Sequence, residues 1–147
     1  GLFDQIICFE TIEHIMDDKK LIRDFANILK PGGRLLLTAP YKNHKPLSGE
    51  RISTREDGGH VRWGYTHEEF EVMLKEVNLK ILKKDYISGV VSQYIIRVIR
   101  FLDSIIPLKL AWVLIFPFRF FQIFNAPVTL LLHYPYLSVG IVAQKAK

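Results

Sequence analysis

The sequence has one cysteine, Cys8, among its 147 residues, and no acidic residue follows Asp103. A lone cysteine excludes a disulfide framework within the chain and fits a reducing compartment. No apolar run reaches the roughly 18 residues of a membrane-spanning helix before a proline or a charge interrupts it. No internal repeat or low-complexity tract is present, and the first residues form no secretory signal. We therefore expect a globular protein of the cytoplasm.

Hydrophobic residues make up 49% of the chain and charged residues 24%, which predicts a domain with a sizeable core. The formal net charge is +5, but basic and acidic residues are interleaved up to Asp103 instead of forming a basic stripe. This distribution argues against a nucleic-acid partner, so none is expected.

The first forty residues carry the clearest pattern. Residues 3–9 and 34–39 are apolar runs typical of buried strands. Between them, apolar residues recur at helical spacing after Asp17 and Asp18, either of which can cap the helix. A Lys-Pro-Gly-Gly sequence at 30–33 is expected to end that helix. Two buried strands joined by one helix predict a parallel βαβ unit with a right-handed crossover.

This stretch resembles the second half of a class I S-adenosylmethionine-dependent methyltransferase of the type 11/12 kind. The resemblance covers roughly residues 1–90 and rests on Phe3-Asp4, Ile6, Glu13-His14-Ile15, Leu29 to Gly33, Leu35 to Leu37, Pro40, Gly59 to Arg62 and Tyr65-Thr66. It implies a partial α/β, Rossmann-like methyltransferase fold: a mostly parallel sheet with an antiparallel last strand and an apolar helical insertion before it. Residues 1–147 are then the C-terminal part of a single methyltransferase domain, with residues 92–133 as a hydrophobic helical insertion or lid.

The resemblance implies methyl transfer from S-adenosylmethionine to a small, lipophilic acceptor, with O-methylation preferred. The glycine-rich cofactor loop of that family has no counterpart here, because Gly32-Gly33 follows a helix and Gly58-Gly59 has no strand before it. We therefore expect this chain to be a fragment that lacks the N-terminal half of its domain. The alternative is a catalytically inactive, truncated domain that acts as a membrane-surface binding module.

The turn after the first strand holds Glu10, Thr11, Glu13 and His14, which the resemblance places beside the cofactor. The pattern Glu-x-x-Glu-His is similar to the metal-binding motif of ubiquinone-biosynthesis O-methyltransferases and of small-RNA 2′-O-methyltransferases. It implies a metal site made by Glu10, Glu13, His14 and His60, and Mg²⁺ or a similar ion suits such ligands. The structural alternative is a solvated turn in which Glu13 caps the next helix and His14 packs beneath it.

Residues 41–65 form a long loop at the carboxyl end of the second strand, where ligands bind in sheets of this kind. His44 and His60 are the candidate general bases, because imidazole titrates near neutral pH. The candidate substrate-binding residues are Tyr41, Arg62, Trp63 and Tyr65. The alternative is a solvated loop that Trp63 and Tyr65 anchor to the core.

Residues 92–133 are strongly apolar and aromatic, with scattered basic residues. Pro107, Pro117 and Pro127 are expected to break the helices there. Such a segment fits a peripheral anchor on anionic lipid, centred on residues 95–133. The alternative is a helical lid that packs over the sheet and lines an apolar pocket. Both interpretations point to a lipid-like or membrane-resident acceptor.

The remaining elements look structural. Thr66 and Glu69 form a capping box that begins a helix ending near Val77. Residues 79–87 predict a strand near a sheet edge, and residues 136–143 predict a final strand that runs antiparallel inside the sheet. The sheet would then have four strands, three parallel and one reversed, with the first strand at an open edge.

Overall fold

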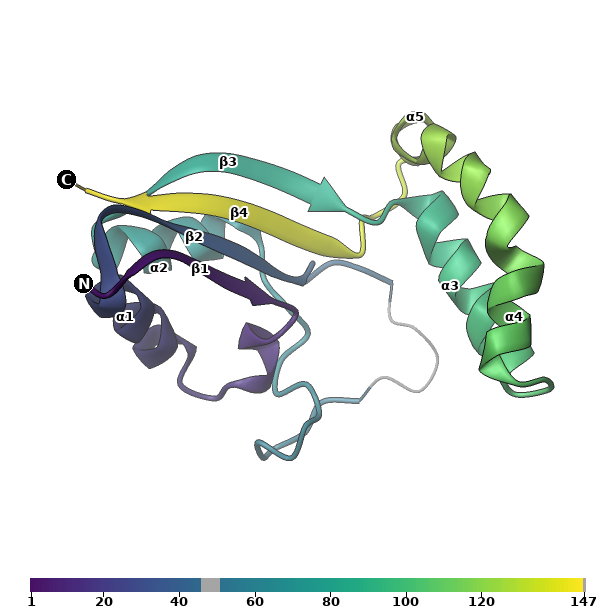
Figure 1. The fold of residues 1–147 in the computed structure, drawn as a ribbon, viewed down its shortest axis with the longest axis horizontal. Helices are drawn as coiled ribbons and strands as arrows, with labels where there is room; N and C mark the ends of the chain where they lie inside the picture. Colours follow the sequence, from purple (N-terminus) through teal and green to yellow (C-terminus); the bar gives the residue numbers. More distant parts are fainter. Residues whose placement is uncertain (46–50, 147) are drawn as a thin grey trace.

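A computed structural model describes residues 1–45 and 51–146; residues 46–50 of the predicted loop and Lys147 of the predicted polar tail lie outside the described residues. Its centre is one mixed sheet in the order β1-β2-β4-β3 (Figure 1). β1 and β2 are parallel, and β4 is antiparallel to both of its neighbours, as predicted. β1 lies at the edge of this sheet and has no strand on its outer side among the described residues, as predicted. The strands are β1 (Phe3–Phe9), β2 (Leu29–Pro40), β3 (Leu79–Ile87) and β4 (Ser138–Lys145).

Helix α1 (Asp18–Ile28) makes the crossover from β1 to β2, and Asp17 caps it by accepting a hydrogen bond from the backbone N–H of Lys20. β2 begins at Leu29, earlier than the predicted strand. The pairing with β1 shifts between Leu29 and Arg34, because the intervening residues bulge out of the ladder, with Gly32 at φ 78°. The Lys-Pro-Gly-Gly sequence therefore shapes the start of a strand as well as the end of a helix.

Helix α2 (His67–Glu76) lies on the same face of the sheet as α1 (Figure 1). Its predicted capping box is present: the Thr66 hydroxyl accepts from the Glu69 backbone N–H, and the Glu69 carboxylate accepts from the Thr66 N–H. The core fills the space between these helices and the sheet. Its fully buried members include Ile12, Ile22, Leu29, Leu35, Leu37, Phe70, Leu74 and Val139.

The segment between β3 and β4 is helical. The name helical hairpin is used here for residues 90–132, which comprise α3 (Val90–Asp103), α4 (Leu108–Ile115), η2 (Phe116–Phe124) and α5 (Asn125–Leu131). The last three follow one another without a gap, so Leu108–Leu131 is one helical stretch of 24 residues. By length and composition this stretch could cross a membrane, although a core helix of a soluble protein can pass the same test.

The prediction that prolines break this segment holds only in part for Pro117 and Pro127, because the type of helix changes near each of them but the chain stays helical. Each lies in the first turn of its own segment, where the missing N–H costs little, and the helical path continues through both. Pro107 does separate α3 from α4.

The helical hairpin stands beyond the carboxyl ends of β1, β2 and β3, and it does not lie over a face of the sheet (Figure 1). Within the hairpin, α4, η2 and α5 pack against α3. The carboxyl ends of the parallel strands are where ligands bind in open α/β sheets. The fold thus places the apolar hairpin at the same end of the sheet as the predicted site residues.

Candidate active site

A tight turn fixes the chain that leaves β1. Glu10 has a positive φ of 46°, and its backbone N–H donates to the Thr38 carbonyl of β2. The Thr11 hydroxyl donates to the Phe9 carbonyl. The Glu10 side chain accepts a hydrogen bond from the Ser138 hydroxyl, 3.3 Å away at the start of β4. These contacts direct Glu10 toward β4. The short helix η1 (Ile12–His14) follows, and it buries Ile12 and Glu13.

Glu13 is a buried carboxyl group, with only 1% of the residue exposed. Its Oε1 lies 3.8 Å from Nε2 of His14, and its Oε2 has no hydrogen-bond partner within the described part of the chain. Burial raises the pKa of Glu13 to about 7. A carboxyl group that titrates near neutral pH can act as an acid or a base there.

Glu13, His14 and His60 come together although a long loop separates them in sequence. One ligand atom from each lies within 4.8 Å of the others, which could hold a metal ion. The two imidazole rings meet edge to face, with centroids 4.7 Å apart. The Nδ1 of His14 lies 2.9 Å from the Gly59 carbonyl, which can only accept, so Nδ1 donates this hydrogen bond and Nε2 faces Glu13.

The fourth predicted metal ligand, Glu10, lies outside this group of three. The structure therefore brings together three of the four residues from the predicted metal site. The loop residues around His60 are held by backbone hydrogen bonds, from Val61 N–H to the Glu13 carbonyl and from Ser53 N–H to the His60 carbonyl. This anchoring places His60 against η1.

His44, the other candidate base, is buried after the end of β2, and its Nδ1 lies 2.6 Å from the Tyr41 carbonyl. It does not join the group formed by Glu13, His14 and His60. Tyr41 packs edge to face against Tyr86 of β3, with ring centroids 5.4 Å apart.

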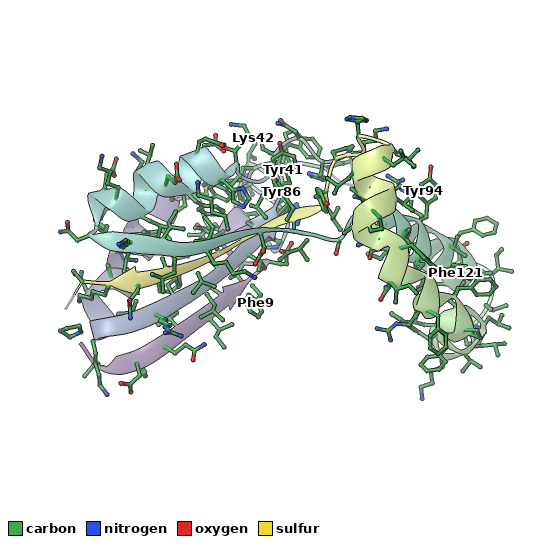
Figure 2. All side chains as sticks on the ribbon, turned by 90° about the horizontal axis from the view of Figure 1, so that it is seen from above. Phe9, Tyr41, Lys42, Tyr86, Tyr94 and Phe121 are labelled. Atoms are coloured by element: carbon green, nitrogen blue, oxygen red, sulfur yellow. The ribbon has the colours of Figure 1, made fainter. Side chains whose placement is uncertain are left out.

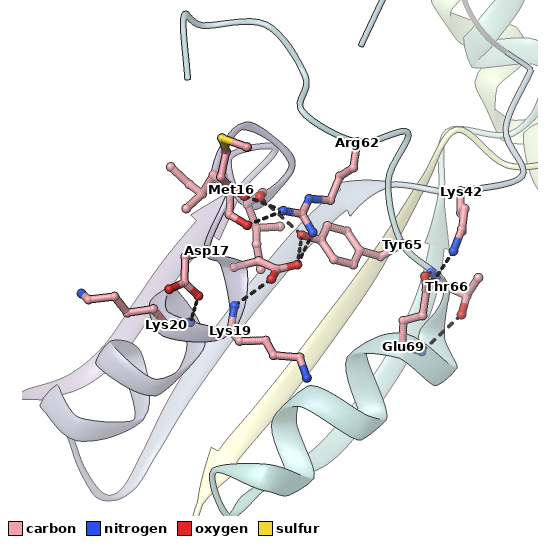
Figure 3. Close-up of polar contacts among 12 residues, drawn as sticks. Met16, Asp17, Lys19, Lys20, Lys42, Arg62, Tyr65, Thr66 and Glu69 are labelled. Atoms are coloured by element: carbon pink, nitrogen blue, oxygen red, sulfur yellow. Dashed lines mark hydrogen bonds and ion pairs between the residues drawn. The ribbon is translucent and has the colours of Figure 1, made fainter. Parts of the chain in front are cut away.

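Arg62 and Tyr65 hold the loop onto α1 (Figure 3). Arg62 forms an ion pair with Asp18 at 2.5 Å and donates to the carbonyls of Ile15 and Met16. The Tyr65 hydroxyl donates to the same Asp18 carboxylate at 2.8 Å. Burial and this carboxylate raise the pKa of Tyr65 well above its ordinary value. Sequence reasoning missed Asp18, because nothing local to a helix start signals a partner on a distant loop.

A groove of about 660 Å³ runs between the start of α1, the loop and α2. Three of the predicted substrate-binding residues, Arg62, Trp63 and Tyr65, border it, and Tyr41 does not. Lys42 and Glu69 form an ion pair at its rim. Trp63 is the most accessible of the three, with 41% of its surface exposed, whereas Tyr65 is buried.

Gly64 sets the path of the loop beside this groove. Its φ is +125°, and a Cβ at this position would lie 2.0 Å from the Pro40 carbonyl oxygen. Only glycine fits so close an approach in that conformation. The approach lets Tyr65 N–H donate to the Pro40 carbonyl and joins the loop to the end of β2.

A family model described as "Methyltransferase domain" matches residues 1–84. The ubiquinone biosynthesis O-methyltransferase of Xanthomonas euvesicatoria is 47% identical over 38 residues, which are 26% of this chain and 16% of that enzyme. The enzyme of the same name from Coxiella burnetii is 40% identical over 43 residues, 29% of this chain and 18% of that enzyme.

Solved structures share the fold along almost the whole chain. The Haemonchus contortus phosphoethanolamine N-methyltransferase 2, in complex with S-adenosyl-L-methionine, gives a TM-score of 0.57 at 17% identity over 99% of this chain and 34% of that one. An O-methyltransferase from a Brevibacillus brevis multienzyme, in complex with S-adenosyl-L-homocysteine, gives 0.53 at 18% identity over 99% and 45%. A [4+2]-cyclase, SpnF, gives 0.55 at 18% over 99% and 50%.

The chain thus spans about a sixth of the length of the curated relatives that it matches and at most about half of these three structures. The cyclase shows that this fold also serves other reactions, so the fold alone does not specify the reaction. The family model covers more than half of the chain, and the overall fold is shared with these structures. The chain belongs to the methyltransferase domain family and has the class I, Rossmann-like fold of methyltransferases that depend on S-adenosylmethionine.

Proposed function

We propose that this chain is the C-terminal, acceptor-side part of an enzyme that transfers a methyl group from S-adenosylmethionine to a hydroxyl group of a small, lipophilic acceptor. The observation that carries the proposal is the grouping of Glu13, His14 and His60 directly after β1, in a chain of the methyltransferase family. The curated relatives named above are O-methyltransferases of ubiquinone biosynthesis, which supports an oxygen acceptor.

In this reaction the acceptor oxygen attacks the methyl carbon, a C–O bond forms, the C–S bond breaks, and S-adenosylhomocysteine leaves. The hydroxyl proton must pass to a base. His60 and Glu13 are suitable, because both are partly or fully withdrawn from water and the pKa of Glu13 lies near 7. Alignment of the two reactants supplies much of the remaining rate enhancement. In this proposal Glu10, Thr11, Glu13 and His14 border the cofactor, and Trp63 and Arg62 contact the acceptor.

A divalent cation fits the same group. One carboxylate and two imidazoles form a mixed ligand set, and the buried Oε2 of Glu13 lacks a partner within the described residues. Such an ion, Mg²⁺ or Mn²⁺, would hold the acceptor oxygen and favour its deprotonation. Calorimetric titration of Mn²⁺ into the wild type and Glu13→Gln tests this idea, and Glu10→Gln is the matched control. Binding should be lost in Glu13→Gln and kept in Glu10→Gln; equal heats in all three proteins would remove the metal from the proposal.

The activity is tested by transfer of a labelled methyl group to a phenolic acceptor, with the full-length protein that carries this chain. His60→Gln should lower kcat by roughly 10²- to 10⁴-fold, as expected for loss of a general base. His44→Gln is the comparison, because His44 is the other candidate base and lies apart from the group. A large loss in His44→Gln with full activity in His60→Gln would move the base to His44.

The rival function is a catalytically inactive domain that only binds membranes. The feature that favours it is the large exposed apolar surface of the helical hairpin. Absence of methyl transfer to any phenolic or lipid-like acceptor, together with membrane binding, would favour that rival. In either case we propose that the protein works in the cytoplasm, on the surface of a membrane.

A further inference from the structure

The helical hairpin exposes far more apolar surface than a protein in water usually does. Ten large apolar side chains of the stretch Leu108–Leu131 are each at least half exposed. Figure 2 shows side chains projecting from this stretch into open space, Phe121 near its middle. Isolated apolar residues on a surface are ordinary, but a contiguous apolar surface of this kind marks a binding site. The ten are Val113, Leu114, Phe116, Phe118, Phe120, Phe121, Ile123, Phe124, Leu130 and Leu131.

The charges of the hairpin point to the chemistry of the partner. Residues 90–132 carry four cations and one acidic residue, Asp103. Arg119 lies 6.0 Å from the Trp112 ring, and Arg97 donates to the Tyr134 hydroxyl. Cations and amphipathic aromatic rings beside a broad apolar surface match the headgroup region of an anionic bilayer. The four cations are Arg97, Arg100, Lys109 and Arg119.

The lengths of the two arms argue against a hairpin that crosses the bilayer. Leu108–Leu131, which includes the nine-residue 3-10 helix η2, would extend about 40 Å. Helix α3, with 14 residues, extends only about 21 Å, less than the roughly 30 Å of the hydrocarbon core. Both arms join the sheet, so both ends of the hairpin must stay on one side. Arg97 and Arg100 would also lie within the hydrocarbon. The hairpin therefore suits the plane of the interface.

Hydrogen bonds between the two arms of the hairpin, and from the hairpin to the segments beside β3 and β4, hold it to the sheet. The Thr129 hydroxyl accepts from Val90 N–H, and the Asn125 side chain accepts from Ser92 N–H. The buried Gln93 amide donates to the carbonyls of Ser88, just after β3, and of Pro135, in the segment that leads into β4. These bonds tie both arms to the end of the sheet that carries Glu13.

We infer that residues 90–132 form a monotopic membrane-docking element that lies in the interface of an anionic bilayer and brings the carboxyl ends of the strands to its surface. An acceptor dissolved in the bilayer would then meet the site without crossing water. An apolar groove of about 520 Å³ between the two arms, which Val98, Ile115 and Phe121 help to line, gives such an acceptor a path. This last step rests on the proposed function, whereas the docking does not.

Flotation of the full chain with phosphatidylcholine vesicles, with and without phosphatidylserine, tests the docking. The double variant Phe120→Asp/Ile123→Asp should lower partitioning by about a hundredfold or more, because two large apolar side chains no longer enter the bilayer. Leu82→Asp is the matched control, since Leu82 is an exposed apolar residue of β3, and its partitioning should stay within about twofold of the wild type. Arg100→Gln/Lys109→Gln should lower binding to the phosphatidylserine vesicles by about fivefold per cation.

The inference is overturned if the wild type does not float, or if the Asp double variant floats as well as Leu82→Asp. If the protein is a dimer in solution, stays dimeric when vesicles are added and does not float with them, the apolar surface is an interface with a second copy of the chain. Sodium carbonate should release the wild type from vesicles, and retention would overturn the interfacial placement in favour of a spanning helix. Flotation requires no methyl transfer, so its failure leaves the proposed function intact, and inactivity on a soluble acceptor leaves the docking intact.

Discussion

The side-chain oxygen of Thr129 accepts a hydrogen bond from the backbone N–H of Val90, 2.8 Å away and separated by 39 positions in the sequence. The residue before α3 is Gly89, which has no side chain to cap the helix. Thr129, on α5, supplies the cap from the other arm of the hairpin. A Cβ at Gly89 would lie 2.1 Å from that hydroxyl, so the glycine makes room for the contact.

The first prediction concerns this contact. Thr129→Val keeps the shape of the side chain but leaves the Val90 N–H buried without a partner. We expect the free energy of unfolding to fall by about 1–3 kcal/mol, as for other buried donors that lose their acceptor. Urea denaturation measures the change, and Thr54→Val, at an exposed position of the loop, is the control. Equal midpoints for the two variants would contradict the capping role.

The second prediction is a pH dependence. The pKa of Tyr65 is raised in the folded protein, so the neutral phenol is favoured there, whereas the unfolded chain loses this proton near pH 10. The stabilising effect is therefore complete below about pH 10 and is lost as the pH rises toward the folded-state pKa. The stability of the wild type should fall by up to about 1.4 kcal/mol per pH unit above pH 10, relative to Tyr65→Phe. Parallel pH profiles from chemical denaturation would show that this assignment is wrong.

The third prediction concerns the loop clamp. Arg62→Lys keeps the charge but cannot reach Asp18 and the carbonyls of Ile15 and Met16 together. We expect a loss of about 1–3 kcal/mol in stability and faster proteolysis within the loop. Arg55→Lys, an exposed change in the same loop, should alter neither quantity. A limited-digestion time course distinguishes the two, and identical cleavage rates would rule out the clamp.

The fourth prediction concerns the open edge of the sheet. Ile7 and Phe9 of β1 are more than half exposed, and β1 has no neighbour on its outer side in the described chain (Figure 2). Exposed apolar edge strands invite pairing between molecules, and a lysine blocks it. Ile7→Lys should reduce self-association of this chain in sedimentation velocity, whereas Val72→Lys on α2 should not. Unchanged association in Ile7→Lys would place the contact elsewhere.

Features that depend on neighbours in sequence, or that follow from the family resemblance, could be predicted from the sequence. The capping box at Thr66 and Glu69, the Asp17 cap and the reversed last strand all follow local or family patterns, and all are confirmed. The Asp18–Arg62 pair could not be predicted, because 44 residues separate its members and charge alone does not choose between many partners. The grouping of His60 with Glu13 was predicted only through the family resemblance. No local pattern separates Glu10 from that group.

The continuity of Leu108–Leu131 was also missed, since proline was expected to end each helix. The effect of a proline depends on its position in the helix, and Pro117 and Pro127 both lie in the first turn of their helical segments, η2 and α5. Only the three-dimensional path of the helix reveals that position.

The position of β4 has a consequence for folding during synthesis. Although β2 and β3 precede it in the chain, they do not pair with each other, because β4 lies between them. β1 and β2 can pair earlier, but β3 cannot join the sheet until residues 138–145 have left the ribosome, by which time the whole apolar hairpin has already emerged. Until then the edges of β2 and β3 and the hairpin are exposed together, which is when chaperones or a nearby bilayer would protect the nascent chain from aggregation.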